Sequence, residues 1–183
     1  HCAWGTVRQT ACLLHLAEVC GLAAQLSVEK GIELTEIPSL DLQLHLVQNG
    51  TMIAFFNDFD MEDPEPWKEG ALIFGNRGFF ADYNARPNEP LDTNVANVWS
   101  QELSHLIAGN PRPPHEVAQR IRDIECFNHG KRISGEAFLN LLESDETSLA
   151  NSETVLRSQA LEVLYNTLLA ACPGFQAIPA KSL

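Results

Sequence analysis

Hydrophobic and polar residues alternate along residues 41–48, where leucines at every second position are separated by polar side chains. Another apolar run occupies residues 51–56, and Asn49-Gly50 stands between the two segments. Asn-Gly in this setting is typical of a β-hairpin, because both central residues of a type I′ turn need a positive φ. We therefore expect the two segments to pair as antiparallel strands. The leucines expected to face the core are Leu42, Leu44 and Leu46.

A second pair of apolar segments has the same arrangement. Residues 71–74 and 79–83 flank residues 75–78, whose two glycines and one asparagine are typical of a turn. Residues 32–37 alternate at period two and end at Pro38, which predicts one more strand. Together these segments predict an antiparallel sheet of about five strands built from hairpins.

Helical signals precede and follow the predicted strands. Thr6-Val-Arg-Gln9 has the form of a capping box, and an apolar stripe follows it as far as a stop at Gly31. From residue 95 onward, four segments with helical periodicity are separated by proline, glycine or polar residues. These predicted helices span residues 95–108, 114–130, 134–142 and 152–172.

The order of these elements predicts an α+β fold, because strands are grouped together and helices are grouped together. We expect an N-terminal helix and the antiparallel sheet within residues 1–90, followed by a mostly helical C-terminal half in residues 91–183. A length of 183 residues suits one domain. The helical region is therefore expected to pack on the same sheet as part of a single domain.

The balance of charge narrows the range of partners. The chain has 24 acidic residues against 12 lysines and arginines, which gives a formal net charge of −12. This charge repels phosphate groups and anionic lipid surfaces within a Debye length of about 8 Å. We therefore expect no nucleic-acid partner, and no membrane partner since no apolar run reaches ~18 residues. An acidic surface suits a basic partner protein, or simply keeps a small domain in solution.

The number of cysteines is odd, which argues against a disulfide scaffold and for a reducing compartment. Four of the five lie in apolar helical surroundings, where a free thiol behaves as a small hydrophobe. We expect these four to be reduced and buried, and the protein to be cytoplasmic. The four are Cys12, Cys20, Cys126 and Cys172, and the fifth is Cys2.

An acidic segment between the two predicted hairpins is the main candidate for recognition. Residues 57–70 hold six acids against one lysine, together with two prolines and Trp67, so we expect an exposed loop. Tryptophan is enriched among interface hot spots, and acids around it would steer a basic partner. The default interpretation is a solvated run of charge, to which a partner-binding loop is the main alternative, and a competing interpretation places Trp67 in the core beneath the sheet. The acids assigned to partner binding are Asp58, Asp60, Glu62, Asp63 and Glu65.

Cys2 is a weak candidate for nucleophilic catalysis. It lies ahead of a predicted helix N-terminus, where the helix dipole favours a thiolate, and His45 or His105 could act as its base. This combination predicts a cysteine-dependent hydrolase or transferase as the alternative function. No nucleophile signature surrounds Cys2, so an incidental thiol near the start of the sequence is the simpler interpretation.

Cys126 and His129 are a weak candidate pair for metal binding, because their spacing places both side chains on one helix face. A structural zinc site needs four ligands, usually from two such pairs. The only other compact group is His1 with Cys2, and a Cys-x-x-His spacing alone is common by chance. We therefore expect no metal and no cofactor.

The sequence also lacks a phosphate-binding glycine loop, Gly-x-Ser-x-Gly, His-Glu-x-x-His and a dinucleotide fingerprint. The first hypothesis is therefore an acidic, non-enzymatic protein-binding module of the immunity protein, secretion chaperone, adaptor or inhibitor type. The cysteine enzyme is the second hypothesis. The third is a structural or assembly subunit that forms homo-oligomers through its helical half.

Overall fold

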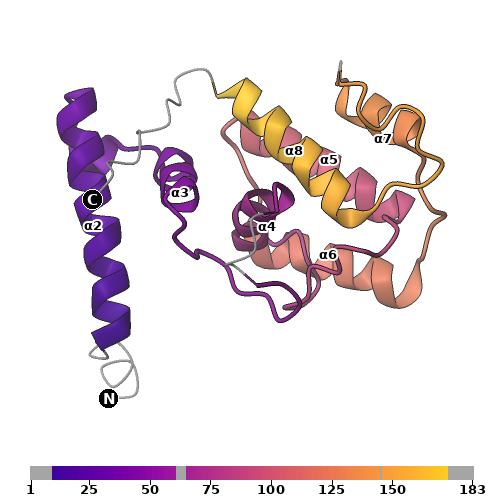
Figure 1. The fold of residues 1–183 in the computed structure, drawn as a ribbon, viewed down its shortest axis with the longest axis horizontal. Coiled ribbons are helices and arrows are strands. Elements are labelled where there is room, and N and C mark those ends of the chain that lie inside the picture. The colour runs from indigo at the N-terminus through magenta and orange to yellow at the C-terminus, as the bar shows by residue number, and fades with distance from the viewer. Residues whose placement is uncertain (1–9, 61–64, 145, 173–183) are drawn as a thin grey trace. The chain divides into compact units, whose positions relative to one another are not determined.

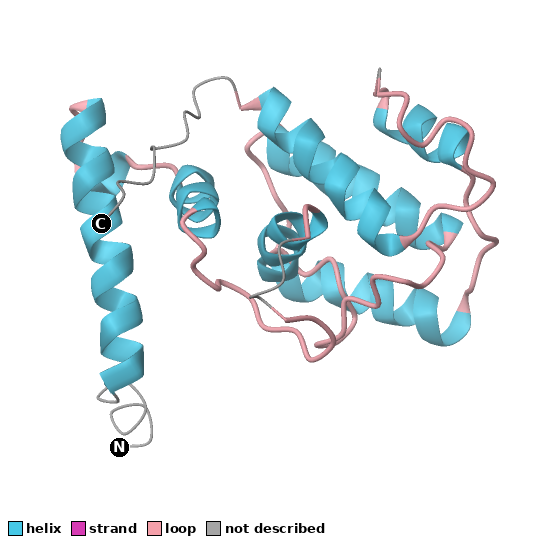
Figure 2. Ribbon diagram, viewed as in Figure 1, coloured by secondary structure: helices cyan, strands magenta, loops and turns pink. Residues whose placement is uncertain are grey.

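The computed structural model describes residues 10–60, 65–144 and 146–172 of the chain. Within these ranges it has seven α-helices, one 3-10 helix and no β-strand (Figure 2). The predicted α+β class and its antiparallel sheet are therefore wrong, and the fold is helical. The first elements are α2 (Thr10–Lys30), η1 (Leu34–Glu36) and α3 (Ser39–Gln48). The others are α4 (Trp67–Asn76), α5 (Thr93–Ile107), α6 (Pro114–Phe127), α7 (Gly135–Leu142) and α8 (Arg157–Ala171).

The first predicted hairpin strand, residues 41–48, belongs to α3. The alternating leucines that suggested a strand belong to a longer pattern, because Leu40, Leu44 and Val47 recur at helical spacing. Leu44 and Val47 are buried in the structure. Asp41 lies in the first turn of α3, where a carboxylate is favoured by the helix dipole.

Asn49-Gly50 ends α3 instead of joining two strands. Gly50 has a φ of 79°, as the hairpin would require, but its N–H donates to the carbonyl of Val47 at 2.9 Å. The N–H of Thr51 donates to the carbonyl of Leu46 at 2.9 Å. These two bonds form the Schellman motif, which satisfies the free carbonyls at a helix C-terminus. The positive φ was predicted correctly for Gly50, but Asn49 has a φ of −83°, so the predicted type I′ turn is wrong.

The second predicted hairpin fails for the same reason. Residues 71–74 lie in α4, and Gly78, two residues after the end of that helix, has a φ of 82°. The N–H of Phe79 donates to the carbonyl of Phe74 at 3.1 Å, which again closes the helix with a Schellman bond. Residues 79–83 then follow as an irregular segment, and the predicted strand at 32–37 contains η1.

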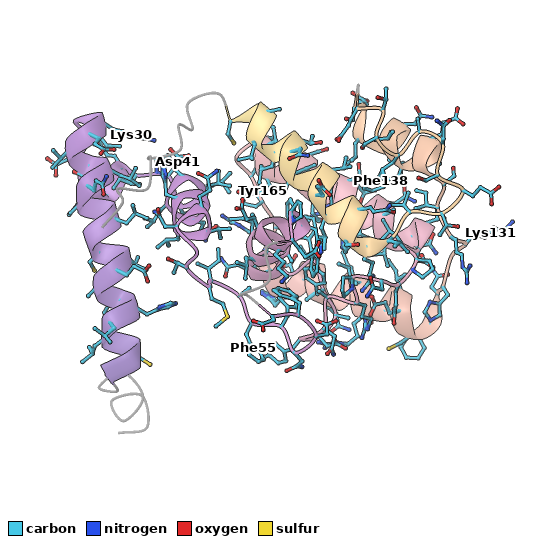
Figure 3. All side chains as sticks on the ribbon, viewed as in Figure 1. Lys30, Asp41, Phe55, Lys131, Phe138 and Tyr165 are labelled. Atoms are coloured by element: carbon cyan, nitrogen blue, oxygen red, sulfur yellow. The ribbon has the colours of Figure 1, made fainter. Side chains whose placement is uncertain are left out.

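The described residues form two compact units, residues 10–51 and residues 52–172. In the first unit, α2 and α3 pack together and are joined by an ion pair of 2.6 Å between Lys30 and Asp41 (Figure 3). The hydroxyl of Thr51 donates to the carboxylate of Glu18 at 2.6 Å. Cys12–Lys30 of α2 is long and apolar enough to cross a membrane, by length and composition only.

The second unit is organised around α5, which packs against α6, α7 and α8, while α4 packs against α8 (Figure 1). Trp99 of α5 is fully buried, and its indole N–H donates to the carbonyl of Phe79 at 2.7 Å. The rings of Phe79 and Phe80 lie 6.2 and 5.8 Å from that of Trp99. Helices α5 to α8 correspond to the four helices predicted after residue 90.

Three buried residues join the N-termini of α5, α7 and α8 through a closed ring of backbone hydrogen bonds. The N–H of Leu91 donates to Val155 at 2.8 Å, Val155 donates to Ile133 at 3.0 Å, and Ile133 donates to Leu91 at 3.1 Å. Each residue stands directly before the N-cap of its helix. An apolar residue at this position is typical of a hydrophobic staple, which fixes the direction in which the chain enters the helix.

The two helix-ending glycines allow a matched test of the corrected assignment. Gly50→Ala should lower the free energy of unfolding of its unit by about 1 kcal/mol, because alanine disfavours a positive φ and the space around Gly50 is open. Gly78→Ala should lower the free energy of unfolding by clearly more than Gly50→Ala does, since the added Cβ would also lie 2.0 Å from the carbonyl oxygen of Pro114. Urea unfolding of both variants measures the difference, and equal losses would contradict the assignment.

Candidate functional site

Residues 52–60 lead into α4 and carry most of the candidate site. Phe56 anchors this segment, because its side chain is buried and its ring lies 4.8 Å from that of Phe80 and 5.1 Å from that of Phe59. The neighbouring Phe55 points the other way and is 57% exposed (Figure 3). Of these two adjacent phenylalanines, Phe56 therefore lies in the core and Phe55 lies on the surface.

Hydrogen bonds tie this segment to residues 83–86. The carboxylate of Asp58 accepts the backbone N–H groups of Ala85 at 2.9 Å and Arg86 at 2.6 Å. The N–H of Asn57 donates to the carbonyl of Tyr83 at 2.8 Å. Asp58, which was assigned to partner binding, therefore also holds two loops together.

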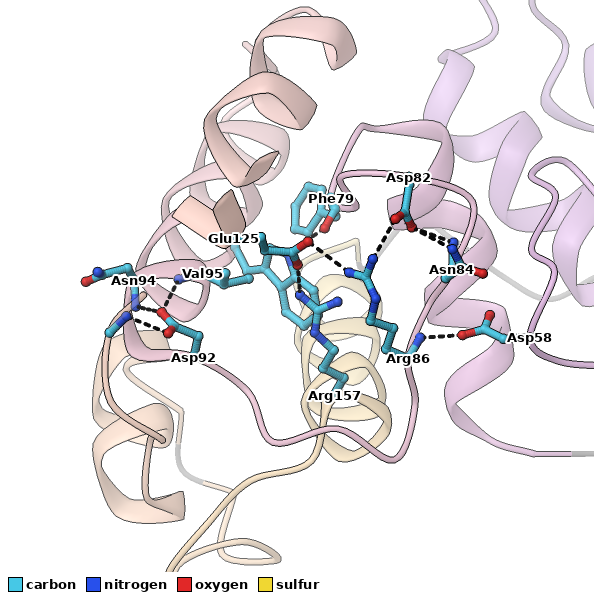
Figure 4. Close-up of polar contacts among 12 residues, drawn as sticks. Asp58, Phe79, Asp82, Asn84, Arg86, Asp92, Asn94, Val95, Glu125 and Arg157 are labelled. Carbon is cyan, nitrogen blue, oxygen red and sulfur yellow. Dashed lines mark hydrogen bonds and ion pairs between the residues drawn. The ribbon is translucent and has the colours of Figure 1, made fainter. Parts of the chain in front are cut away.

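A network of charged side chains anchors residues 82–86 to the helical core (Figure 4). The guanidinium of Arg86 pairs with Asp82 at 2.5 Å and with Glu125 at 2.8 Å. Glu125 also accepts from Arg157, which is 4% exposed and lies 5.7 Å from the centre of the Trp99 ring. Burial is the largest single effect on the Arg86 guanidinium and lowers its pKa, but the carboxylates of Glu125, Asp82 and Glu89 together raise that pKa above its ordinary value.

An open groove of about 430 Å³ lies beside this anchored loop, and we call it the aromatic groove. Tyr83 is 69% exposed at its rim, and its ring meets that of Phe55 edge-on with 6.4 Å between the centroids. Two large aromatic side chains are thus exposed together and held in contact. Residues lining the groove include Ile53, Phe55, Phe80, Tyr83, Pro114 and Arg122.

A second hollow, of about 520 Å³, brings together the described residues that were assigned to partner binding. Asp58, Asp60 and Glu65 line it with Trp67, and Glu162 of α8 adds another acid. We call it the acidic hollow. Glu62 and Asp63 lie outside the described residues.

Trp67 is a wall of the acidic hollow and not an exposed anchor. Its side chain is 8% exposed, and its ring meets that of Phe59 edge-on at 5.0 Å. The expectation of an exposed loop over residues 57–70 is wrong at its end, because α4 begins at Trp67. Prolines and acids at residues 63–66 suggested a loop, but they precede a helix whose first residue packs inward.

The candidate catalytic residues are placed as follows. His45 is buried in α3, and His105 is half-buried in α5 with its Nε2 at 3.3 Å from a guanidinium nitrogen of Arg112. The two histidines belong to different compact units. Cys2 lies outside the described residues, so its pairing with either histidine stays a prediction.

Cys126 lies near the end of α6 and His129 lies two residues beyond that helix, and both are exposed. Among the residues that the structure describes, no group of three or more histidine, cysteine or acidic side chains could hold a metal ion. The expectation of buried cysteines is wrong, because three of them stand at exposed positions of α2 and α6 and the fourth, directly after α8, is only half-buried. Cys12, Cys20 and Cys126 are exposed, and Cys172 is half-buried.

Sequence reasoning missed the aromatic pair and the ion network. Phe55 and Tyr83 were placed on sheet strands, where alternation would have hidden one side chain of every two. The signal available in the sequence was local: Phe55 and Phe56 are adjacent, and neighbouring side chains of an extended segment point to opposite sides. Glu125, one of the two partners of Arg86, lies 39 residues away, a separation over which a single sequence carries no contact information.

The ion network should be sensitive to loss of its central carboxylate. Glu125→Ala should lower the free energy of unfolding by about 2–3 kcal/mol, because it leaves the buried Arg157 without its partner. Adding Arg157→Met should recover part of this loss, since it removes the uncompensated charge. Urea unfolding measures both effects, and Glu153→Ala at an exposed position is the control. If the losses in the free energy of unfolding from the two substitutions simply add in the double variant, Glu125 and Arg157 are not coupled.

His45 should make the first unit sensitive to acid. Burial, and then the nearby Lys30, lower the pKa of His45 below its ordinary value of 6.5, while Asp41 and Glu29 oppose the shift. The unfolded chain therefore binds the proton more readily, so stability is complete above about pH 6.5 and falls as the pH drops toward the folded-state pKa.

Thermal melts from about pH 5 to pH 7.5 should show this loss. His45→Gln should reduce the change of melting temperature with pH. His15→Gln, on the exposed face of α2, should leave that change as it is in the wild type. The same slope in both variants would show that His45 does not set the pH dependence.

Comparison of the chain with protein-family models, with curated proteins and with solved structures finds no match. The function must therefore be inferred from the geometry of the site. That geometry combines an aromatic rim held by hydrogen bonds with an acidic hollow, and residues 52–60 contribute to both.

Proposed function

We propose that this chain is an acidic, non-enzymatic protein-binding module whose recognition surface is the aromatic groove. The observation that carries the proposal is the exposed contact between Phe55 and Tyr83 at the rim of the groove. Aromatic side chains are enriched at interfaces, where a few of them supply most of the binding energy. A groove bordered by such a pair fits a partner side chain or segment that covers both rings.

Rigidity supports this proposal. The backbone next to Phe55 is fixed by the buried Phe56 and by the bonds that Asp58 accepts, and Tyr83 is fixed through its carbonyl. A surface that is ordered before binding loses less conformational entropy when the partner arrives. The network around Glu125 thus serves recognition by holding the loop that carries Tyr83.

The charge of the surroundings supports a basic partner. The acidic hollow contributes Asp58, Asp60, Glu65 and Glu162, and the whole chain has a formal net charge of −12. Acids at the edge of an interface mainly accelerate the encounter with a basic surface. A partner with a basic rim around an apolar centre would complement both features.

An assembly subunit is the second candidate, and α2 favours it. This helix exposes four large aliphatic side chains in the isolated chain, which is typical of a surface that another chain covers. Recovery of an untagged second copy would distinguish self-association from a separate partner in the experiment below. The four side chains are Leu13, Leu14, Leu16 and Val28.

The proposal predicts that two substitutions abolish binding without unfolding the protein. Phe55→Ala and Tyr83→Ala should each weaken partner binding about tenfold or more, while melting temperatures stay near that of the wild type. Capture from a lysate of the native host, with quantitative mass spectrometry, compares each variant with the wild type. Phe127→Ala is the matched control, because Phe127 is 87% exposed on α6 outside the groove.

Trp67→Ala provides the opposite pattern in the same experiment. Removing this buried ring should cost about 3–5 kcal/mol of stability, as for other core aromatics, and so lower the melting temperature. If every protein captured by the wild type is captured equally by Phe55→Ala and Tyr83→Ala, the proposed recognition surface is wrong.

A further inference from the structure

A third hollow adjoins the aromatic groove along residues 52–60, with a volume of about 630 Å³. The described residues around it provide apolar walls, and its charged lining groups are two carboxylates. It shares Phe55 with the aromatic groove, and it shares Phe59 with the acidic hollow. We call it the Phe55–Asp60 hollow. Its main lining side chains are Met52, Phe55, Phe56, Asp58, Phe59 and Asp60.

This lining combines two kinds of contact that one type of side chain can use together. Aromatic walls attract a cation over the ring face and cover an apolar stem. Carboxylates bind a guanidinium through charge-assisted hydrogen bonds, often two in parallel. Arginine fits both, because its planar guanidinium stacks on aromatic rings and is less strongly hydrated than an ammonium group.

The protein already places one of its own cations at the same corner, on the acidic-hollow side. The ammonium of Lys68 lies 5.7 Å from the centre of the Phe59 ring and donates to the backbone carbonyl of Asp60. Lys68 is 6% exposed, so this contact is made largely away from water. The Phe59 ring and the backbone carbonyl of Asp60 therefore bind a basic group in this fold, and both residues also line the Phe55–Asp60 hollow.

The carboxylate of Asp58 is fixed in position before any partner binds. It accepts the N–H groups of Ala85 and Arg86, one on each oxygen. Each carboxylate oxygen has a second acceptor site, so both can accept further hydrogen bonds. Asp58 is exposed, which leaves its carboxylate accessible from the surface.

We propose that the Phe55–Asp60 hollow binds an arginine side chain of the partner protein. This inference rests on the proposed function and specifies the chemistry of the partner. Phe55 and Phe59 cover the stem and the guanidinium plane, and the carboxylates of Asp58 and Asp60 neutralise its charge.

The test uses the full chain, labelled with nitrogen-15, and a blocked pentapeptide of sequence Ser-Leu-Arg-Leu-Ser. Titration should shift amide signals mainly within residues 52–60. The counterpart with citrulline in place of arginine should bind at least tenfold more weakly, because citrulline keeps the shape and removes the charge. Phe55→Ala and Asp60→Asn should each weaken binding of the arginine peptide at least fivefold. The controls Phe127→Ala and Glu153→Gln change an exposed aromatic and an exposed acid elsewhere and should leave binding unchanged.

Equal binding of the arginine and citrulline peptides, or shifts spread over distant acids such as Glu153, would overturn the assignment. A lysine counterpart that binds as tightly as the arginine peptide would also overturn it. If the arginine peptide fails while Phe55→Ala still abolishes capture of the partner, the proposed function stands without the arginine site. If the arginine peptide binds but Phe55→Ala and Tyr83→Ala capture the partner as well as the wild type does, the proposed function fails.

Discussion

The carboxylate of Glu125 is the interaction on which the candidate site depends most. Arg157 is buried over Trp99 at the start of α8, and a buried guanidinium without a partner would cost several kcal/mol. Glu125 of α6 neutralises it and uses its second oxygen to bind Arg86. The carboxylate that neutralises the buried Arg157 therefore also fixes the surface loop of residues 82–86. The position of this loop thus follows from the formation of the core.

The exposed aromatic rim follows from this constraint. Once Arg86 is held, its backbone N–H and that of Ala85 fix Asp58, and the segment that contains Phe55 is tied to the loop that contains Tyr83. The two rings cannot move into the core, because Phe56 and Phe80 already occupy the adjacent space. The chain thus maintains an apolar surface in water, and a partner that covers it would release the stored hydration cost.

Local sequence patterns were informative about backbone geometry and ambiguous about the element that uses it. A positive φ at Gly50 or Gly78 serves a hairpin turn and a Schellman motif equally well, so Asn-Gly alone cannot separate the two. The leucines of residues 40–46 satisfy a period of two and a helical period at once. A strand also needs a partner strand, and only the whole fold supplies or denies it. Here α3 buries Leu44 and Leu46 and leaves Leu40 and Leu42 half-buried, and no pairing strand forms in the described ranges.

The sequence by itself determined the features that act over a few residues. Pro114 begins α6, Gly31 follows the last residue of α2 as expected, and the four helices after residue 90 lie close to their predicted ranges. Tertiary structure alone decided which side chains are covered. Trp67 is buried although it stands in an acidic segment, and Phe55 is exposed although it stands in an apolar run. The physical reason is that backbone conformation follows from local sterics and capping. Burial and ion pairing instead follow from contacts between residues such as Arg86 and Glu125 that are far apart in sequence.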